Sequence, residues 1–379
     1  MESSAGKRIK VALVINGFLI GGAQNVLLQI LKRIDYTRFE PVLITLIRKY
    51  EDEKTYLYDK LPEGTKVYDL RFRGFRDLRA WGALWSALRE AKPDVVFANL
   101  FFSNTIMRVF KPFFGYRVIT AEHNTYFDKT FFQKSTDFVL SFLTYRIVAV
   151  SNTVANFTSK QEHIARSKFA INYGGIDISA LQKEMEESDP VETWKMTGFA
   201  PPEKIILSVA RVVPQKNHRL TLEGFALFVR SHPEYRLLVV GGGNLIEELQ
   251  SYTEELGLAR KVRFMGYQKQ LYPFFRIADF FISTSLHEGF GTTHAEALAA
   301  GLPLVSTKTA GPDEMIKEGV NGFFIPVYTK EAVAESLAKM AAQDLRPMRE
   351  AARRSADAYS IDRMISTYEK LFTEAANQS

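Results

Sequence analysis

Residues 285–303 read SLHEGFGTTHAEALAAGLP and form the most informative stretch of the chain. A strand-like run at 279–283 enters a glycine-containing loop, and a helix is predicted to begin near Thr292. A helix N-terminus presents unpaired N–H groups and partial positive charge, so it attracts phosphate. Glu288 in the loop and Glu296 about one turn inside the helix would repel a phosphate unless each has a separate task.

A nucleotide-sugar resolves this conflict, because it carries hydroxyl groups beside its diphosphate. The helix amides would hold the diphosphate, one carboxylate the ribose hydroxyls, and the other carboxylate the hexose hydroxyls. The stretch therefore predicts a nucleotide-sugar site, and with it glycosyl transfer.

Composition is that of a soluble globular protein, with 379 residues, 46% hydrophobic and 24% charged. No apolar run approaches the roughly 20 residues that a membrane span needs. The run VALVINGFLIGGA follows Lys7, Arg8 and Lys10 and resembles a signal peptide, but Asn16 and Gly17 interrupt it. A strand followed by a glycine loop is the favoured interpretation. The absence of cysteine fits a cytoplasmic protein.

Positive charge is concentrated in the first half of the chain. Residues 1–180 hold 26 Lys and Arg against 17 Asp and Glu, whereas the remainder holds 23 against 26. This asymmetry indicates an anionic partner, either phosphate-bearing lipid, a membrane surface or nucleic acid. A solvated surface alone also explains it.

Short β-branched runs alternate with helical patterns, which predicts an α/β protein with parallel sheets and crossover helices. We expect strands at 9–15, 41–47, 94–98, 117–121 and 147–150, and a second set at 205–209, 236–240, 262–265, 279–283 and 304–306. The expected organisation is a Rossmann-like domain over 1–185, a second over 200–358, and a helix within 359–379 that crosses back to the first. The polar stretch 181–204 between the two sets is expected to be a linker.

Three glycine motifs follow predicted strands. Gly21-Gly22-Ala23 opens a predicted helix, Gly241-Gly242-Gly243 leads into another, and Gly266-Tyr267 closes a strand where its backbone can cup a base. Small residues at such points let a ligand approach the backbone. A simple turn explains the first two motifs equally well.

Arg211 and Lys216 follow the first strand of the second set, in SVARVVPQKN. A departing nucleoside diphosphate needs its charge neutralised by a metal or by fixed cations. The sequence has no Asp-x-Asp pair for a divalent metal, so these two cations are predicted to do that work. His294 and Glu296 do not share a helix face, which argues against zinc.

His123 in TAEHNTY ends a predicted strand and is a candidate to hydrogen-bond the transferred sugar, although a structural role is equally consistent. Two segments rich in Phe with basic residues, 101–117 and 130–146, are typical of a membrane interface. They are equally typical of core helices with basic ends.

The combined pattern resembles the family-four retaining glycosyltransferases of GT-B fold, which implies two facing Rossmann-like domains, an acceptor-binding domain over 1–185 and a nucleotide-sugar-binding domain over 200–358. The motifs that carry the resemblance, across nearly the whole chain, are GGAQNVLL, AEHN, AVS, ARVVPQKN, VVGGGN, VRFMGY, HEGFGTTHAEALAAGLPLVSTKTAGPDEMI and SIDRMISTYEKLF. The chain departs from the family pattern at Gly174-Gly175-Ile176-Asp177 and at Gly242, which replaces a usual acidic residue.

The resemblance implies a role for each matching position. Glu288 would contact the donor hexose and Glu296 the ribose, Arg211 and Lys216 would hold the diphosphate, and His123 would contact the sugar near the reacting carbon. The remaining nucleotide-sugar contacts would come from Gly22, Gly243, Gly266, Tyr267, Phe290, Gly291, Thr292 and Thr293. Neither a metal nor another cofactor is implied, and the leaving phosphate oxygen would take the acceptor's proton in a front-face reaction.

Within the family, AGPDEMI and the basic first half are most similar to enzymes that extend polyprenyl-diphosphate-linked glycans with N-acetylhexosamine. The expected donor is UDP-linked, and the expected location is the cytoplasm, peripheral at the inner face of the cell membrane. A soluble saccharide acceptor and a non-catalytic protein that binds nucleotide-sugar or nucleic acid are the alternatives. No recognition motif supports nucleic acid, and no G-x-G-x-x-G follows the first strand as a dinucleotide oxidoreductase would require.

Overall fold

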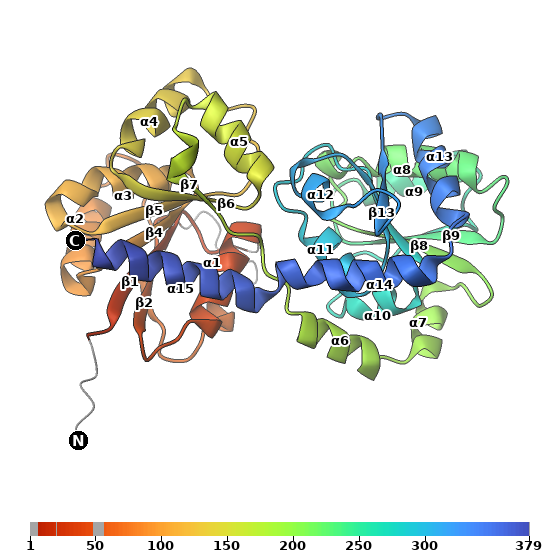
Figure 1. Cartoon of the computed structure of the whole chain (residues 1–379), viewed down its shortest axis with the longest axis horizontal. Helices are drawn as coiled ribbons and strands as arrows, with labels where there is room; N and C mark the ends of the chain where they lie inside the picture. The colour runs from red at the N-terminus through yellow and green to blue at the C-terminus, as the bar shows by residue number, and fades with distance from the viewer. Residues whose placement is uncertain (1–6, 20, 48–56, 379) are drawn as a thin grey trace. The chain divides into compact units, whose positions relative to one another are not determined.

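The computed structural model describes residues 7–19, 21–47 and 57–378, which form two compact units. The first unit runs to Gly175 and takes up the chain again from Ile361, whereas the second unit is Ile176–Ser360 (Figure 1). Each unit is a parallel sheet with helices on its faces, which confirms the α/β fold class predicted from the alternating pattern.

In the described part of the first unit, seven strands pair in parallel in the order β3-β2-β1-β4-β5-β6-β7. Continuous hydrophobic runs form the central strands because both faces of the sheet are covered by helices. The strands are β1 (Ile9–Ile15), β2 (Phe39–Thr45), β3 (Lys66–Asp69), β4 (Val95–Asn99), β5 (Arg117–Glu122), β6 (Thr144–Ala149) and β7 (Phe169–Ile171). The α-helices are α1 (Gly22–Arg33), α2 (Leu78–Ala91), α3 (Phe101–Phe114), α4 (Phe131–Ser141), α5 (Asn152–Gln161) and α15 (Ile361–Asn377).

The last helix, α15, belongs to the first unit although it follows every strand of the second. It lies beside α1 and β1 (Figure 1). Tyr368 and Phe372 are buried against Phe97 of β4, with ring centroids 5.0 and 5.8 Å from it. Gly175 is required where the chain leaves this unit, because a Cβ there would lie 2.7 Å from the Cα of Ile361.

In the second unit, six parallel strands take the order β10-β9-β8-β11-β12-β13. The strands are β8 (Lys204–Val209), β9 (Tyr235–Val240), β10 (Val262–Phe264), β11 (Phe280–Ser283), β12 (Leu304–Thr307) and β13 (Gly322–Ile325). The α-helices are α6 (Ile178–Glu187), α7 (Pro190–Thr197), α8 (His218–Phe228), α9 (Ile246–Glu255), α10 (Tyr272–Ile277), α11 (Thr292–Ala299), α12 (Ala310–Met315), α13 (Lys330–Ala341) and α14 (Leu345–Ala356).

The stretch 181–204, expected to be a linker, is instead folded into the second unit. Asp177 caps α6 by accepting from the N–H of Ala180, and Asp189 caps α7, which has Pro190 in its first turn. Both helices contact α10, and Leu181 is buried. Polar and proline residues there are helix caps rather than linker signals. The units accordingly divide at Gly175, not at 185.

Strand order reverses direction once in each sheet, between β1 and β4 in the first unit and between β8 and β11 in the second. Ligands of open α/β sheets bind beyond the carboxyl ends of strands at such a switch point. The loops that follow β8 and β11 hold Lys216 and Glu288, and the residues that follow β1 and β4 lead into α1 and α3.

Candidate active site

An ion pair lies at the switch point of the second unit. Nζ of Lys216 contacts Oε1 of Glu288 at 2.5 Å, with side chains only 14% and 11% exposed. Ser285 Oγ donates to the same carboxylate oxygen at 2.9 Å. Both contacts fall on Oε1, so Oε2 keeps its capacity to accept from a ligand hydroxyl.

Backbone and side-chain hydrogen bonds fix the two loops against each other. The N–H of Leu286 donates to the carbonyl of Gln215, and Nε2 of Gln215 donates to the carbonyl of His287. Oγ1 of Thr284 donates to the carbonyl of Asn217. These bonds exist because β8 and β11 are neighbours in the sheet, so their carboxyl ends meet. Arg211 is exposed on the β8 loop, on the same connection as Lys216.

The loop after Glu288 ends at the N-terminus of α11. Gly291 is the N-cap, at φ +84 and without a side-chain cap hydrogen bond, so the first amides of α11 keep their donor capacity. A Cβ on Gly311 would lie 1.7 Å from the carbonyl oxygen of Phe290, which shows how closely α12 approaches this loop. Thr292 is exposed and Thr293 is half-buried. The geometry suits a phosphate.

Glu296 lies one turn into α11 and is half-buried. Tyr272 Oη donates to Oε1 of Glu296 at 3.2 Å. Burial raises the pKa of Glu296 to about 7, the phenol of Tyr272 lowers it, and the negative charge of Glu184 raises it. Tyr272 was not predicted, because it precedes Glu296 by 24 residues and only the folded sheet brings the two side chains together.

His294, by contrast, is a structural residue of α11. Its Nε2 lies 2.9 Å from Oγ of Ser306, the ring is fully buried, and burial lowers its pKa to about 4. Across residues 7–19, 21–47 and 57–378, no group of three or more His, Cys, Asp and Glu side chains is placed to hold a metal ion.

The glycines after β9 are explained by packing within the protein. A Cβ on Gly243 would lie 2.0 Å from the carbonyl oxygen of Val212, and a Cβ on Gly241 would lie 2.0 Å from that of Ala210. The N–H of Gly241 also donates to the carbonyl of Gly266 at 2.8 Å. The turn that holds Gly241 and Gly243 is therefore packed against the Arg211 loop and is joined to Gly266 by a hydrogen bond, and Tyr267 is exposed. The close backbone approach is to another loop of the chain.

Gly22 and His123 belong to the first unit. A Cβ on Gly22 would meet nothing within 4 Å, so the fold itself does not require glycine there. His123 Nε2 lies 2.8 Å from Oδ1 of Asn99, which ends β4. Burial lowers the pKa of His123 to about 4, so the ring is neutral at physiological pH. All other predicted site residues lie in the second unit.

Comparison with known proteins identifies the class. Residues 20–180 match the family model Glycosyltransferase Family 4, and residues 192–358 match Glycosyl transferases group 1. The chain belongs to these glycosyltransferases and has the GT-B fold, which confirms the family and fold that the motifs predicted.

Individual relatives differ in what their names describe. The chain is 23% identical to the UDP-Gal:alpha-D-GlcNAc-diphosphoundecaprenol alpha-1,3-galactosyltransferase of Escherichia coli, over 89% of each chain. It is 34% identical to the mannosylfructose-phosphate synthase of Agrobacterium fabrum, but over only 36% of this chain and 32% of that enzyme.

Solved structures agree with the fold. A glycosyltransferase from Rickettsia africae superposes with a TM-score of 0.85 at 17% identity, covering 98% of this chain and 100% of that one. HepE of Anabaena in complex with UDP superposes with a TM-score of 0.82, also at 17% identity, covering 97% and 100%.

Proposed function

We propose that this glycosyltransferase moves a hexose or N-acetylhexosamine from a UDP-linked donor to a polyprenyl-diphosphate-linked saccharide, with retention of anomeric configuration and without a metal. The observation that carries the proposal is the Lys216–Glu288 pair beside the uncapped N-terminus of α11. It combines a cation, a hydroxyl acceptor and phosphate-binding amides in one unit.

The diphosphate is held by positive charge on two sides. The amides of Gly291, Thr292 and Thr293 lie on one side. On the other side the β8 loop supplies two cations, Lys216, which is fixed by its ion pair, and Arg211, which is exposed. Charge builds on the leaving phosphate as the glycosidic bond breaks, so these groups stabilise the transition state more than the ground state.

Glu288 positions the donor sugar. Its Oε1 is taken by Lys216 and Ser285, and Oε2 accepts from a hexose hydroxyl. In the transfer step a bond forms between the acceptor oxygen and the anomeric carbon while the bond from that carbon to phosphate oxygen breaks. The acceptor's proton passes to the leaving phosphate oxygen, so no carboxylate base is needed. His123, neutral, contributes a hydrogen bond to the sugar.

Glu296 binds the ribose diol. A carboxylate accepts from two adjacent hydroxyl groups, and binding them restores the solvation that burial removes. Tyr272 holds one oxygen of the carboxylate and so sets its direction. UDP is the favoured nucleotide, because the E. coli relative is named for a UDP-linked donor and the Anabaena structure contains UDP.

The acceptor side of the proposal rests on helix α4. Its buried residues are Asp137 and Ser141, whereas Phe131 and Phe132 are 85% and 75% exposed and Phe142 is 71% exposed. Two polar residues, one of them the charged Asp137, thus face inward while phenylalanines face outward, the reverse of a helix that packs on a core. Such an outer face is stabilised when a lipid surface covers it.

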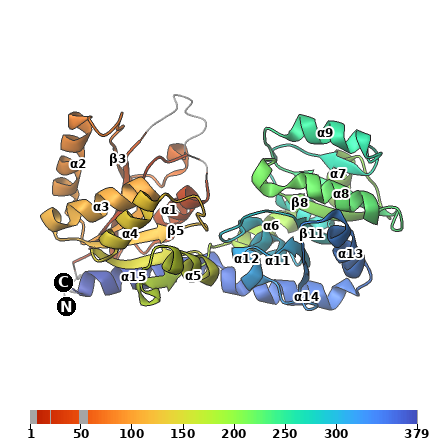
Figure 2. The ribbon, with the colours of Figure 1, turned by 90° about the horizontal axis from the view of Figure 1, so that it is seen from above.

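Helix α3 also exposes apolar side chains. It lies against α4 (Figure 2), and its Val109 and Phe113 are exposed. Burial and the charges of Arg117 and Lys168 lower the pKa of Lys111, so these cations gather near the same helix end. A phenylalanine surface flanked by cations fits an anionic membrane, here the inner face of the cell membrane. Among the described residues no helix has the length and apolarity needed to span a bilayer.

A thermal-shift panel of nucleotides and nucleotide-sugars tests the donor assignment. A ligand that binds only the native state raises the melting temperature, and at equal concentration a tighter ligand raises it more. UDP and at least one UDP-sugar are expected to raise it in the presence of a chelator, more than ADP, GDP or UMP does. The proposal would be contradicted if no nucleoside diphosphate in the panel raised the melting temperature.

A further inference from the structure

A cavity of about 230 Å³ lies in the first unit, whereas the residues proposed to hold the donor lie in the second unit except for Gly22 and His123. Its wall comes from the start of α3, the end of β5 and the segment that enters α4. The lining residues used below are Phe101, Asn104, Glu122, Tyr126, Lys129 and Gln133.

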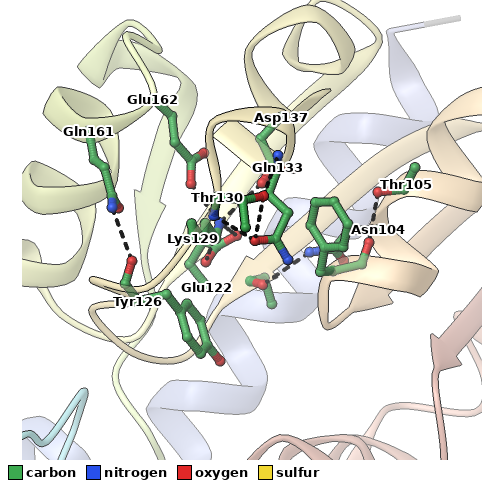
Figure 3. Close-up of polar contacts among 12 residues, drawn as sticks. Asn104, Thr105, Glu122, Tyr126, Lys129, Thr130, Gln133, Asp137, Gln161 and Glu162 are labelled. Atoms are coloured by element: carbon green, nitrogen blue, oxygen red, sulfur yellow. Dashed lines mark hydrogen bonds and ion pairs between the residues drawn. The ribbon is translucent and has the colours of Figure 1, made fainter. Parts of the chain in front are cut away.

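One side of the cavity is held rigid by a buried charge cluster. Nζ of Lys129 contacts carboxylate oxygens of Glu122 at 3.4 Å, Asp137 at 3.1 Å and Glu162 at 2.5 Å (Figure 3). Asp137 also pairs with Arg108 at 2.5 Å. All of these side chains are less than a tenth exposed. Since three carboxylates occupy Lys129, its task is to position Glu122 rather than to meet a ligand.

The charge of this cluster disfavours an anion. Arg108 and Lys129 are matched against Glu122, Asp137 and Glu162, and Asp128 adds a further carboxylate to the cavity wall. Burial and the negative charges of Glu122 and Asp137 raise the pKa of Glu162 to about 7, although Lys129 lowers it. A phosphate group at this wall would meet excess negative charge at low dielectric.

Two amides add hydrogen-bonding capacity for a neutral ligand. Asn104 is only 2% exposed, and its Oδ1 has no partner among the described residues although Nδ2 donates to the carbonyl of Ala121. A buried acceptor without a partner is costly, so a ligand donor would be favoured there. Oε1 of Gln133 accepts from the N–H of Thr130 in the α4 capping box, and this leaves Nε2 as a donor.

We infer that this cavity is a binding site for the terminal, uncharged monosaccharide of the acceptor. Asn104 and Glu122 accept from sugar hydroxyls, Gln133 donates to them, and the rings of Phe101 and Tyr126 cover its apolar C–H face. The volume lies below the range of about 300–1,000 Å³ for larger ligand sites, which suits one sugar rather than a chain.

The inference rests on the proposed function. It adds a pocket for the acceptor's sugar to the membrane surface proposed for the acceptor's lipid. Phe131 and Phe132 directly follow Lys129 and Thr130, so the outward face of α4 begins where the pocket wall ends. A saccharide whose lipid anchor lies in the membrane would thus meet this pocket with its sugar, while the negative wall keeps its diphosphate outside.

The test is saturation-transfer NMR on the whole chain with p-nitrophenyl glycosides of glucose, galactose, mannose and N-acetylglucosamine, and with inorganic pyrophosphate added as an anionic competitor that should not displace them. We expect at least one glycoside to bind the native protein. Asn104→Leu keeps the side-chain volume but loses the acceptor, and Gln133→Glu keeps the capping acceptor but loses the donor. Each is expected to weaken glycoside binding at least about fivefold.

Asn156→Ala on the exposed face of α5 is the matched control and should bind the glycosides as the native protein does. UDP-induced thermal stabilisation of the same samples reports folding and the donor site independently. The inference would be overturned if a native protein that is stabilised by UDP bound no glycoside. It would also be overturned if Asn104→Leu and Gln133→Glu both bound the glycosides as tightly as the native protein does. Loss of UDP stabilisation with glycoside binding intact would instead contradict the donor assignment alone.

Discussion

Lys216 and Glu288 are 72 residues apart in sequence, yet Nζ of one lies 2.5 Å from Oε1 of the other. The carboxylate that seemed incompatible with a phosphate site has its own cation. Lys216 therefore offsets the charge of Glu288 beside the diphosphate, to which Lys216, Arg211 and the helix amides are proposed to bind.

Substitution of either partner should abolish turnover and also lower stability. Lys216→Met leaves Glu288 partly buried without its cation, and Glu288→Gln leaves Lys216 likewise. Each is expected to lower kcat at least about 100-fold, because a group that stabilises transition-state charge is lost or displaced. Steady-state rates and thermal unfolding measure the two effects separately.

The double variant Lys216→Met, Glu288→Gln separates stability from catalysis. Because it contains no unpaired charge, its melting temperature should recover toward that of the native protein while its activity stays low. Recovery of activity along with stability would show that the pair has only a structural role.

Donor use should depend on pH through Glu296. The carboxylate form binds the ribose diol, and its pKa in the unliganded protein is about 7. We expect kcat/KM for a UDP-sugar to fall as pH is lowered through 7, because the donor's diphosphate stays charged while Glu296 is protonated. Glu296→Gln should have a lower kcat/KM that is flat over this range. A variant profile with the same slope as the native one would assign the titration to another group.

The same pKa shift has a consequence for stability. Glu296 has a folded pKa above its ordinary value of 4.5, so its proton favours the folded state. Its stabilising contribution is complete below 4.5 and is lost as pH rises through 7. The melting temperature of Glu296→Gln minus that of the native protein should therefore be larger at pH 8 than at pH 5.

Tyr272→Phe tests the residue that sequence patterns did not reveal. The phenol lowers the pKa of Glu296 by donating to it, so its removal should move the midpoint of the donor pH profile to higher pH. Donor affinity at neutral pH should fall about threefold to tenfold, since one hydrogen bond to a charged group is lost. An unshifted midpoint would show that Tyr272 does not position Glu296.

Vesicle flotation tests the membrane surface of α4. The double variant Phe131→Ser, Phe132→Ser removes two exposed rings without opening the core. It is expected to weaken binding to vesicles that contain phosphatidylglycerol at least about tenfold. Val191→Ser, Val327→Ser, at exposed positions of the second unit, is the matched control. Equal flotation of both variants, or none by the native protein, would favour a soluble acceptor.

The two small-residue motifs should respond differently to alanine. Gly243→Ala places a Cβ against the carbonyl of Val212 and should lower the melting temperature. The Cβ that Gly22→Ala adds has no atom within 4 Å, so the melting temperature should be unchanged. Weaker donor binding by this variant would then indicate that the donor lies at the start of α1. Unchanged donor affinity would remove Gly22 from the site.

The central strands were predictable from sequence because buried parallel strands are continuous hydrophobic runs. The family was predictable because the motifs that carry the resemblance extend across nearly the whole chain. The edge strands β3, β7 and β13 were not among those expected, and β3 is short and only partly buried. The helices in 181–204 were missed because Asp177 and Asp189 serve as caps, which composition alone does not distinguish from a linker.

Candidate site residues on one loop and helix, such as Glu288 and Glu296, could be proposed from their spacing. Contacts across the sheet could not, because Lys216 and Tyr272 approach those carboxylates only through strand order. The phenylalanines at 130–146 fit a core helix or a membrane helix in the sequence. The fold adds that Asp137 and Ser141 are the buried residues of α4, and this supports the proposed membrane surface.

The most direct test of the central claim is the transfer of labelled sugar from a UDP-sugar to a lipid-linked saccharide. The assay compares the native protein with Glu288→Gln, and a chelator is present throughout. The account predicts a product from the native protein with the anomeric configuration of the donor, and a rate at least about 100-fold lower for the variant. An inverted product, a strict requirement for added metal, or a near-native rate for Glu288→Gln would contradict it.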